Sequence, residues 1–332
     1  MKIALVTPAG PGVRNGNRVT AVRWSRFLRQ LGHEVLLQES WDGEESEAMI
    51  ALHARRSHRS IARYANAHPD RPLLVALTGT DLYRDVRSDA AARESLELAT
   101  ALIVLQEKGP EELEPGYRAK TRVIYQSAEP ARPLTPAKRR FEVCVIGHLR
   151  EEKDPFRAAL AARLLPATSR VRVTHIGRPY DEALAEKAVS ENSENPRYRW
   201  LGETPRWKAR RLLARSRLLA QTSVIEGGAN VVSEALASGV PVVASRIPGN
   251  VGMLGEDYPG YYPVGDEAAL ARLLHRAEID DGFYQTLEAR CESRRHLVLP
   301  ELEREALGSL IREVVEASSR KNRGLGLYLN RG

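Results

Sequence analysis

Two glutamates, Glu226 and Glu234, are the residues of this sequence whose type and spacing could most clearly do chemistry. They lie in the stretch from Ser223 to Ser245, with seven residues between them. Carboxylates accept hydrogen bonds, and the hydroxyl groups of ribose and of sugars can donate them. The alternative is a capping acid and a solvated charge on a helix, because short motifs often match by chance.

The residues between the two glutamates predict a glycine-rich turn that leads into a helix. Gly227, Gly228, Ala229 and Asn230 leave backbone N–H groups accessible, and the predicted helix follows at 231–238. Free N–H groups and the helix dipole favour an anion at such a helix start. We therefore expect a phosphate group beside the two carboxylates.

The same helix lies between two apolar runs that suit buried strands of a parallel sheet. The runs cover 218–222 and 241–244, and Gly239 ends the helix before the second run. The sequence thus predicts a unit of strand, loop, helix and strand. In such units, ligands bind beyond the carboxyl ends of the strands.

A second charged loop follows the first predicted strand of the chain's second half. It contains His148, Arg150 and Lys153. Cations at a strand end could neutralise a phosphate leaving group. The alternative is a pair of ordinary surface cations.

Three loops in the first half of the chain also follow predicted strands, at 2–7, 50–53 and 72–77. Glycine would allow close approach of a ligand to the backbone, and the other side chains could bind an anion or a sugar. The alternatives are a plain connection, the start of a surface helix, and helix capping. The candidate residues of these loops are Gly16, Asn17, Arg18, His53, Arg55, Arg56, Thr80 and Asp81.

Strands and helices alternate throughout the 332 residues, which is long enough for two domains. We expect an α/β protein with two Rossmann-like, doubly wound domains. The predicted boundaries are 1–136 for the first domain, 137–319 for the second and 320–332 for a loosely held tail. Pro130, Pro133 and Pro136 mark the linker.

Composition narrows the classes of function. The formal net charge of +7 suggests an anionic ligand, yet no basic run is interleaved with aromatic residues, so we do not expect nucleic acid as a partner. No apolar run is long enough for stable membrane insertion, and no signal peptide follows Met1. The two cysteines, Cys144 and Cys291, belong to no cluster with zinc-ligand spacing. These features predict a cytoplasmic protein without a metal site.

The Glu-x7-Glu motif and the Ala-Leu-Ala-Ser-Gly-Val-Pro-Val-Val-Ala-Ser segment that follows it resemble the donor-site signature of retaining GT-B glycosyltransferases. The resemblance implies two Rossmann-like domains that face a central cleft, with a UDP-sugar as co-substrate and no cofactor. It places Glu226 near the donor sugar and Glu234 on the ribose. It also implies that Lys153 grips the diphosphate, with His148 where the family usually has arginine and Arg150 as a substitute.

Four segments of the first half resemble the selenosugar synthases of selenoneine biosynthesis. They read GNRVTAVRW at 16–24, ALHARRS at 51–57, LTGTDLY at 77–83 and VIYQS at 123–127. This resemblance implies transfer of a sugar from a UDP-sugar, of the UDP-GlcNAc or UDP-glucose type, to selenophosphate. An acceptor of this kind requires cations in the first domain, and Arg18, His53, Arg55 and Arg56 are the candidates.

Three other functions remain open at this point. One is an ordinary GT-B glycosyltransferase with a hydroxyl or lipid acceptor, and another is a sugar-nucleotide epimerase of the same architecture. The third is a module that binds a nucleotide or RNA without catalysis. The preferred UDP-sugar, the anomeric outcome and the oligomeric state are also open.

Overall fold

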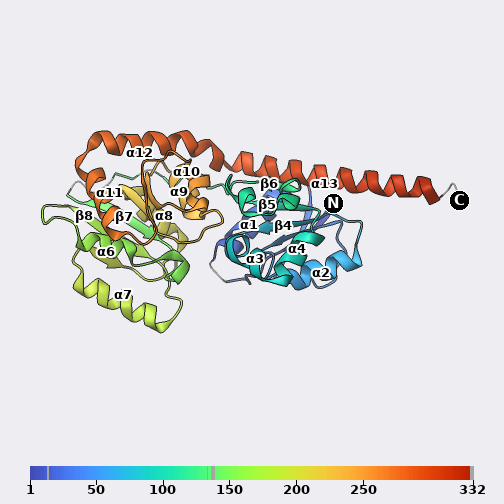
Figure 1. The fold of residues 1–332 in the computed structure, drawn as a ribbon, viewed down its shortest axis with the longest axis horizontal. Coiled ribbons are helices and arrows are strands. Elements are labelled where there is room, and N and C mark those ends of the chain that lie inside the picture. The colour runs from blue at the N-terminus through green and yellow to red at the C-terminus, as the bar shows by residue number, and fades with distance from the viewer. Residues whose placement is uncertain (13–14, 133, 136–138, 330–332) are drawn as a thin grey trace. The chain divides into compact units, whose positions relative to one another are not determined.

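The computed structural model describes residues 1–12, 15–132, 134–135 and 139–329, with side chains described up to 320 (Figure 1). The chain divides into two compact units. The first comprises Met1–Gln126 together with Pro300–Gly332, and the second comprises Ser127–Leu299. Two of the predicted linker prolines, Pro133 and Pro136, lie outside the described residues.

The first unit is built on a six-stranded parallel sheet with the order β2-β1-β3-β4-β5-β6. Its strands are β1 (Lys2–Val6), β2 (Glu34–Gln38), β3 (Ala48–Leu52), β4 (Leu73–Leu77), β5 (Ala101–Val104) and β6 (Thr121–Val123). Ile3 and Leu5 of β1 belong to one apolar cluster, and Ala4 and Val6 belong to another. The strands β3, β4 and β5 are apolar throughout because both faces of the sheet are covered.

Helices supply the cover on both faces of this sheet (Figure 1). They are α1 (Gly16–Gln30), α2 (His58–Ala67), α3 (Val86–Ser88), α4 (Ala90–Leu98), α5 (Pro115–Arg118) and α13 (Pro300–Leu329). Trp24 of α1 packs in the cluster of Ile3 and Leu5. Ile61 of α2 and Leu96 of α4 pack in the other cluster.

The second unit contains another six-stranded parallel sheet, with the order β12-β11-β10-β7-β8-β9. Its strands are β7 (Phe141–Ile146), β8 (Val171–Ile176), β9 (Tyr198–Trp200), β10 (Leu218–Gln221), β11 (Val242–Ser245) and β12 (Tyr261–Tyr262). Its helices are α6 (Arg157–Arg163), α7 (Glu182–Glu194), α8 (Arg206–Arg215), α9 (Asn230–Ala237), α10 (Pro248–Leu254), α11 (Glu267–Ile279) and α12 (Asp281–Arg294). If the strands of this unit are numbered 1 to 6 along the chain and the sheet is read from β9 to β12, the order is 3-2-1-4-5-6. This is the strand order of doubly wound nucleotide-binding folds.

The predicted fold class, two doubly wound α/β units, is confirmed. The central stretch also folds as predicted, since β10, α9 and β11 lie within one residue of the expected 218–222, 231–238 and 241–244. Cys144 and Cys291 are free and buried.

The last helix, α13, belongs to the first unit, whereas the sequence pattern predicts a second domain that extends to 319. Leu307, Leu310 and Ile311 complete the apolar cluster that contains Trp24. Apolar periodicity marks the buried face of a helix, but it does not specify which sheet that face covers. The tail predicted from 320 onward begins inside this helix, which continues to Leu329.

A buried ion pair fixes α13 to α1. The Glu303 carboxylate is 2% exposed and accepts hydrogen bonds from the Arg23 guanidinium at 2.7 Å and 3.0 Å and from Trp24 Nε1 at 2.7 Å. Glu303→Ala would leave the Arg23 guanidinium, itself largely buried, without its counter-charge.

We expect Glu303→Ala to lower the free energy of unfolding by about 3–5 kcal/mol, because removing one partner of a buried pair leaves an uncompensated charge. Chemical denaturation followed by circular dichroism would measure the change. The control is Glu305→Ala on the same helix, where the side chain is exposed. Equal stabilities of the two variants would contradict the structural role of Glu303.

Candidate functional site

The strand order of the second unit locates its ligand-binding edge. The order reverses between the neighbouring strands β7 and β10, and ligands of doubly wound sheets bind beyond the carboxyl ends of the strands at this point. The loop after β7 carries Lys153, and the loop after β10 carries Glu226. The two loops predicted to bind a ligand therefore flank the topological switch point.

Backbone and side-chain hydrogen bonds join these two loops. Val224 N–H donates to the Glu152 carbonyl oxygen at 2.9 Å, and the Thr222 hydroxyl donates to the Lys153 carbonyl oxygen at 2.8 Å. Lys153 itself ends a short 3-10 turn, Glu151–Lys153, and Asp154 leaves that turn with a φ of 41°. The position of Lys153 is thus set by the neighbouring loop as well as by its own.

One carboxylate oxygen of Glu226 accepts three hydrogen bonds. The donors to Oε1 are Ser223 Oγ at 2.6 Å, Gln221 Nε2 at 2.9 Å and Lys153 Nζ, which also forms an ion pair with Glu226. Among the described residues, no hydrogen bond reaches Oε2. The site therefore fixes the carboxylate by one oxygen and leaves the other to accept a hydrogen bond from a ligand.

The backbone of Glu226 is fixed by close packing against α10. A Cβ atom at Gly249 would lie 1.9 Å from the Glu226 carbonyl oxygen, so only glycine fits there. The Ser245 hydroxyl donates to the Ser223 carbonyl oxygen, and Asn250 Nδ2 donates to the Ser245 carbonyl oxygen at 2.9 Å. A rigid backbone under Glu226 means that little reorganisation is needed when a ligand binds.

The turn after Glu226 leads into α9 as predicted. Gly227, Gly228 and Ala229 are buried, and Ala229, the N-cap residue of the eight-residue helix, makes no side-chain cap. Asn230 is the first residue of the helix. The helix start can therefore offer N–H donors to an anion.

Glu234 lies one turn into α9, with its side chain 13% exposed. Its Oε1 accepts hydrogen bonds from Arg206 Nη2 at 2.8 Å and Arg206 Nε at 3.3 Å. Among the described residues, its Oε2 has no hydrogen-bond partner. Like Glu226, this glutamate is held by one oxygen.

The remaining predicted residues of the β7 loop have different surroundings. His148 Nδ1 accepts a hydrogen bond from the Arg178 backbone N–H at 3.1 Å. Arg150 Nε is buried and has no hydrogen-bond partner among the described residues. The structure therefore brings Lys153, but not His148, to the Glu226 carboxylate.

The sequence analysis assigns no role to Gln221, Ser223 and Arg206. In the structure, Gln221 and Ser223 contact Glu226, and Arg206 contacts Glu234. Gln221 is the last residue of β10 and Ser223 follows two residues later, where polar residues end an otherwise apolar run. That interruption was a usable signal. Nothing in the sequence links Arg206 to Glu234, because the two lie on different helices, α8 and α9.

In the first unit, the strand order reverses at the neighbouring strands β1 and β3, and polar candidates follow both strands. The sequence predicts a loop up to Asn17 and a helix from Arg18, but α1 already begins at Gly16, because the Asn15 side chain accepts a hydrogen bond from Arg18 N–H at 3.0 Å and caps the helix there. Positions 13–14 of the predicted loop lie outside the described residues.

His53 follows β3 in a strained conformation, with a φ of 72°. The residue is 3% exposed, its Nε2 lies 3.2 Å from the Thr80 hydroxyl, and its Nδ1 lies 3.8 Å from Asp81 Oδ2. A non-glycine residue with this backbone conformation persists only where its surroundings require it. The structure thus brings the predicted residues His53, Thr80 and Asp81 together.

The Asp81 side chain binds backbone N–H groups and is not accessible to solvent. Its carboxylate is fully buried and accepts hydrogen bonds from the N–H groups of Ala54 at 3.1 Å, Thr78 at 2.9 Å and Gly79 at 2.8 Å. The sequence suggested a catalytic contact. The geometry is that of an anchor that ties the loop after β3 to the loop after β4.

Arg55 is held by acidic neighbours. Its Nε lies 2.9 Å from Asp89 Oδ2, and its Nη1 lies 3.7 Å from Asp85 Oδ1. Burial raises the pKa of Asp85 above its usual range. Arg18 and Arg56, in contrast, have guanidinium groups that form no ion pair among the described residues.

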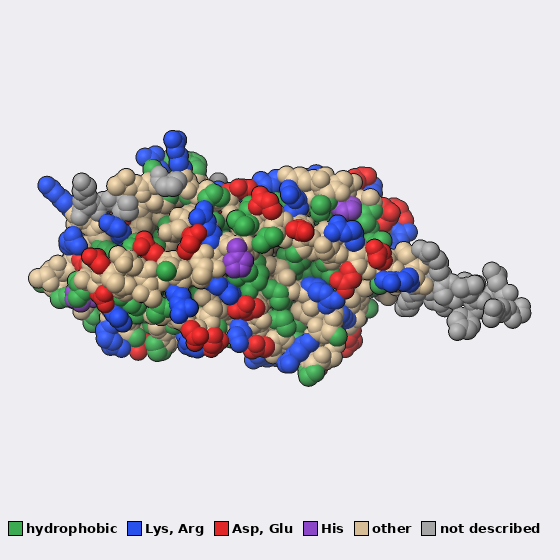
Figure 2. Space-filling model, turned by 90° about the horizontal axis from the view of Figure 1, so that it is seen from above, with side chains coloured by type: hydrophobic (Ala, Val, Ile, Leu, Met, Phe, Trp, Pro, Cys, Tyr) green, Lys and Arg blue, Asp and Glu red, His purple; other side chains and the backbone are tan. Residues whose placement is uncertain are grey.

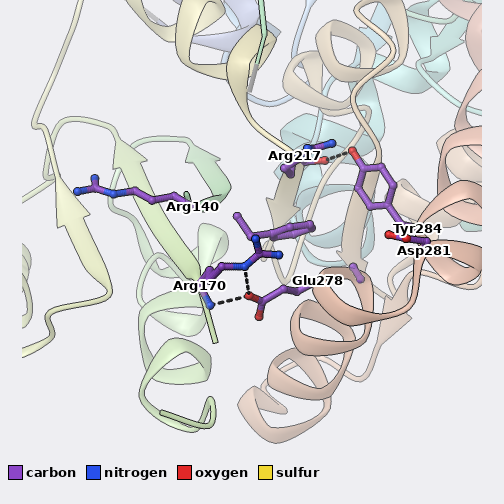
Figure 3. Close-up of a pocket in the computed structure, with 8 residues that line it drawn as sticks. Arg140, Arg170, Arg217, Glu278, Asp281 and Tyr284 are labelled. Atoms are coloured by element: carbon purple, nitrogen blue, oxygen red, sulfur yellow. Dashed lines mark hydrogen bonds and ion pairs between the residues drawn. The ribbon is translucent and has the colours of Figure 1, made fainter. Parts of the chain in front are cut away.

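A small hollow of about 110 Å³ lies elsewhere in the second unit (Figure 3). Its lining includes Phe141 at the start of β7, Arg170 just before β8 and Arg217 just before β10. These are the amino ends of the strands, opposite to the edge that carries Lys153 and Glu226. Arg170 pairs there with the buried Glu278 at 3.4 Å (Figure 3).

The charged side chains do not gather by sign on the face shown in Figure 2, where basic and acidic groups are interspersed. In the described part of the chain, no helix is both long and apolar enough to cross a membrane. Within the same residues, no group of three or more His, Cys, Asp or Glu side chains could hold a metal ion.

Comparison with known proteins gives matches over the whole architecture. A family model described as "Glycosyl transferases group 1" matches residues 127–294. HepE from Anabaena, in complex with UDP and glucose, has a TM-score of 0.73 at 17% identity, over 96% of this chain and 100% of that chain. Sucrose-phosphate synthase from Thermosynechococcus elongatus has a TM-score of 0.78 at 16% identity, over 95% and 99%. These matches confirm the expected GT-B fold.

A buried histidine beside the Lys153 loop gives a prediction on pH. His175 Nε2 donates to the Gly147 carbonyl oxygen at 3.0 Å, and Nδ1 accepts from the Tyr198 hydroxyl at 2.9 Å. Burial lowers the pKa of His175 from 6.5 to about 4. The unfolded chain therefore binds a proton between these values that the folded chain does not, so stability is lost as the pH falls from 6.5 towards 4.

We expect this loss to reach about 3 kcal/mol from His175 alone, since one pKa unit corresponds to about 1.4 kcal/mol. Denaturation of the wild type and of His175→Asn across this pH range would measure it, and the variant should show a shallower dependence. His296→Asn, at an exposed position, serves as the control. Identical slopes for wild type and His175→Asn would contradict the prediction.

Proposed function

The chain belongs to the group 1 glycosyl transferases, since the family model covers half of it, and on this premise we propose that it transfers a sugar from a UDP-sugar held on the second unit. The observation that supports this most directly is the Glu226 carboxylate, held by Lys153, Ser223 and Gln221 at the topological switch point. HepE, whose structure contains UDP and glucose, has the same fold.

Each group of the second unit then has a role that its geometry supports. The free Oε2 of Glu234 accepts a hydrogen bond from a ribose hydroxyl, and the N–H groups at the start of α9 bind phosphate oxygens. The free Oε2 of Glu226 accepts a hydrogen bond from a hydroxyl of the donor sugar. The carboxylates thus orient the donor, while the helix start neutralises part of its charge.

Lys153 stabilises the leaving group. Its ammonium group has three N–H donors, and one of them is used by Glu226, so others remain for an oxygen of the diphosphate. When the bond between the anomeric carbon and the diphosphate oxygen breaks, the electron pair stays on that oxygen. A fixed cation beside this oxygen lowers the barrier because the charge develops in the transition state.

We further propose selenophosphate as the acceptor, which rests on the resemblance of the four segments in the first unit to selenosugar synthases. Selenium attacks the anomeric carbon, the C–Se bond forms, and UDP leaves. Arg18 and Arg56 support this assignment because their guanidinium groups form no ion pair among the described residues and could bind the anionic acceptor. A nucleophile of this strength needs no general base.

A hydroxyl acceptor is the second candidate, and one observation favours it. The buried His53 ring lies beside the Asp81 carboxylate and the Thr80 hydroxyl, an arrangement that could orient a histidine to remove a proton from a hydroxyl group. Selenophosphate has no such requirement. The two candidates therefore differ in whether His53 is needed for the reaction.

The acceptor can be tested directly. The protein is incubated with UDP-GlcNAc or UDP-glucose, and either selenophosphate or a sugar alcohol is added. We expect UDP release and a selenium-containing sugar, identified by mass spectrometry, in the first mixture only. NMR couplings of that product give its anomeric configuration. A glycoside formed only in the second mixture would replace selenophosphate with a hydroxyl acceptor.

The role of Lys153 gives a kinetic prediction. Lys153→Ala should lower kcat at least about tenfold, which corresponds to roughly 1.4 kcal/mol in the barrier, because the leaving UDP loses its counter-charge. Steady-state measurement of UDP release would show the change. Lys187→Ala, at an exposed position on α7, is the control and should leave kcat unchanged. An unaltered kcat in a folded Lys153→Ala protein would remove Lys153 from the mechanism.

A further inference from the structure

Arg206 lies at a helix position where the helix dipole is unfavourable for a cation. It is the first residue of α8, where the dipole disfavours a cation, and the preceding Pro205 makes no side-chain cap. The first turn of α8 contains no acidic residue that would offset this charge. An interaction outside the helix must therefore account for the orientation of the Arg206 side chain.

That interaction is the ion pair with Glu234. Both Arg206 Nη2 and Arg206 Nε donate to the same oxygen, Oε1, at 2.8 Å and 3.3 Å. The Arg206 side chain is 57% exposed, so the pair contributes little to stability. Its clearest effect is geometric, since it fixes the carboxylate while Oε2 keeps no partner among the described residues.

The helix that carries Arg206 is itself anchored. Arg210, one turn further along α8, donates to the carbonyl oxygens of Glu129 at 2.7 Å and Pro130 at 3.0 Å. Leu212 and Leu213 are buried in the second unit. The start of α8 is thus a stable platform from which one side chain reaches α9.

The comparison with Glu226 shows why this contact matters. Among the described residues, three side chains hold Oε1 of Glu226, whereas Arg206 alone holds Oε1 of Glu234. The loss of one donor would leave the first carboxylate oriented but would free the second to rotate. Glu234 therefore depends on Arg206 for its direction.

We propose that Arg206 is a positioning residue that directs the free oxygen of Glu234 to the ribose of the donor nucleotide and so selects ribonucleotides. This inference rests on the proposed function, in which Glu234 binds ribose. The recognised chemistry is a ribose hydroxyl of a uridine diphosphate. Arg206 acts through Glu234 and does not itself touch the nucleotide.

The test compares the binding of UDP and of 2′,3′-dideoxy-UDP by isothermal titration calorimetry. The wild type should bind UDP at least about tenfold more tightly, because a hydrogen bond to a charged acceptor is lost in the dideoxy compound. Arg206→Gln should weaken the binding of UDP by most of that factor and leave the binding of dideoxy-UDP unchanged. Arg206→Lys should restore part of the preference for UDP.

The matched control is Arg170→Gln, which removes an equally exposed arginine paired with a glutamate at the opposite edge of the sheet. It should bind both nucleotides as the wild type does. Thermal unfolding without nucleotide should be nearly the same for the wild type and the Arg206 variants, since a pair with an exposed arginine adds little stability.

The possible failures are distinguishable. If the wild type binds both nucleotides equally, the ribose role of Glu234 is wrong, and with it this part of the proposed function. If the wild type prefers UDP and Arg206→Gln keeps the full preference, only the role of Arg206 is overturned. If Arg206→Gln weakens both nucleotides by the same factor, Arg206 contacts the phosphates directly, and the positioning role is rejected.

Discussion

The candidate site of the second unit depends on the convergence of Lys153, Ser223 and Gln221 on one oxygen of Glu226. A carboxylate this close to a sheet edge would be poorly defined if its orientation were left to solvent. Here the three donors come from two loops that are themselves tied by hydrogen bonds, and the backbone beneath is packed against Gly249. The arrangement is an example of preorganisation, in which protein groups are fixed before the ligand arrives.

The parallel sheets explain why these groups meet at all. In both units, successive strands are added first towards one edge of the sheet and then towards the other edge. Polar residues follow the two neighbouring strands at which this order changes. In the second unit they are Lys153 and Glu226. In the first they include His53, which has a positive φ and lies beside the fully buried carboxylate of Asp81. One topological rule thus supplies the candidate ligand-binding positions of both units.

Much of this could be predicted from the sequence, and the reasons for the exceptions are physical. Apolar runs bounded by glycine located β10, α9 and β11, because those signals are local. Glu226 and Lys153 could be located because they lie in loops that follow apolar strands, and Glu234 because it lies inside the predicted helix. The pairing of Arg206 with Glu234 and the burial of Asp81 could not be predicted, because both depend on which elements become neighbours. The same limit applies to α13, whose apolar face is visible in the sequence but whose partner sheet is not.

The return of α13 to the first unit has a consequence for biosynthesis. The ribosome synthesises Met1–Gln126 long before it synthesises α13. Leu307, Leu310 and Ile311 of that helix complete the apolar cluster around Trp24. The first unit therefore keeps one face of its sheet incomplete until α13 has been made. The second unit, Ser127–Leu299, is continuous in the chain and can close its own sheet earlier. The core of the first unit can thus be completed only after the whole of the second unit has been made.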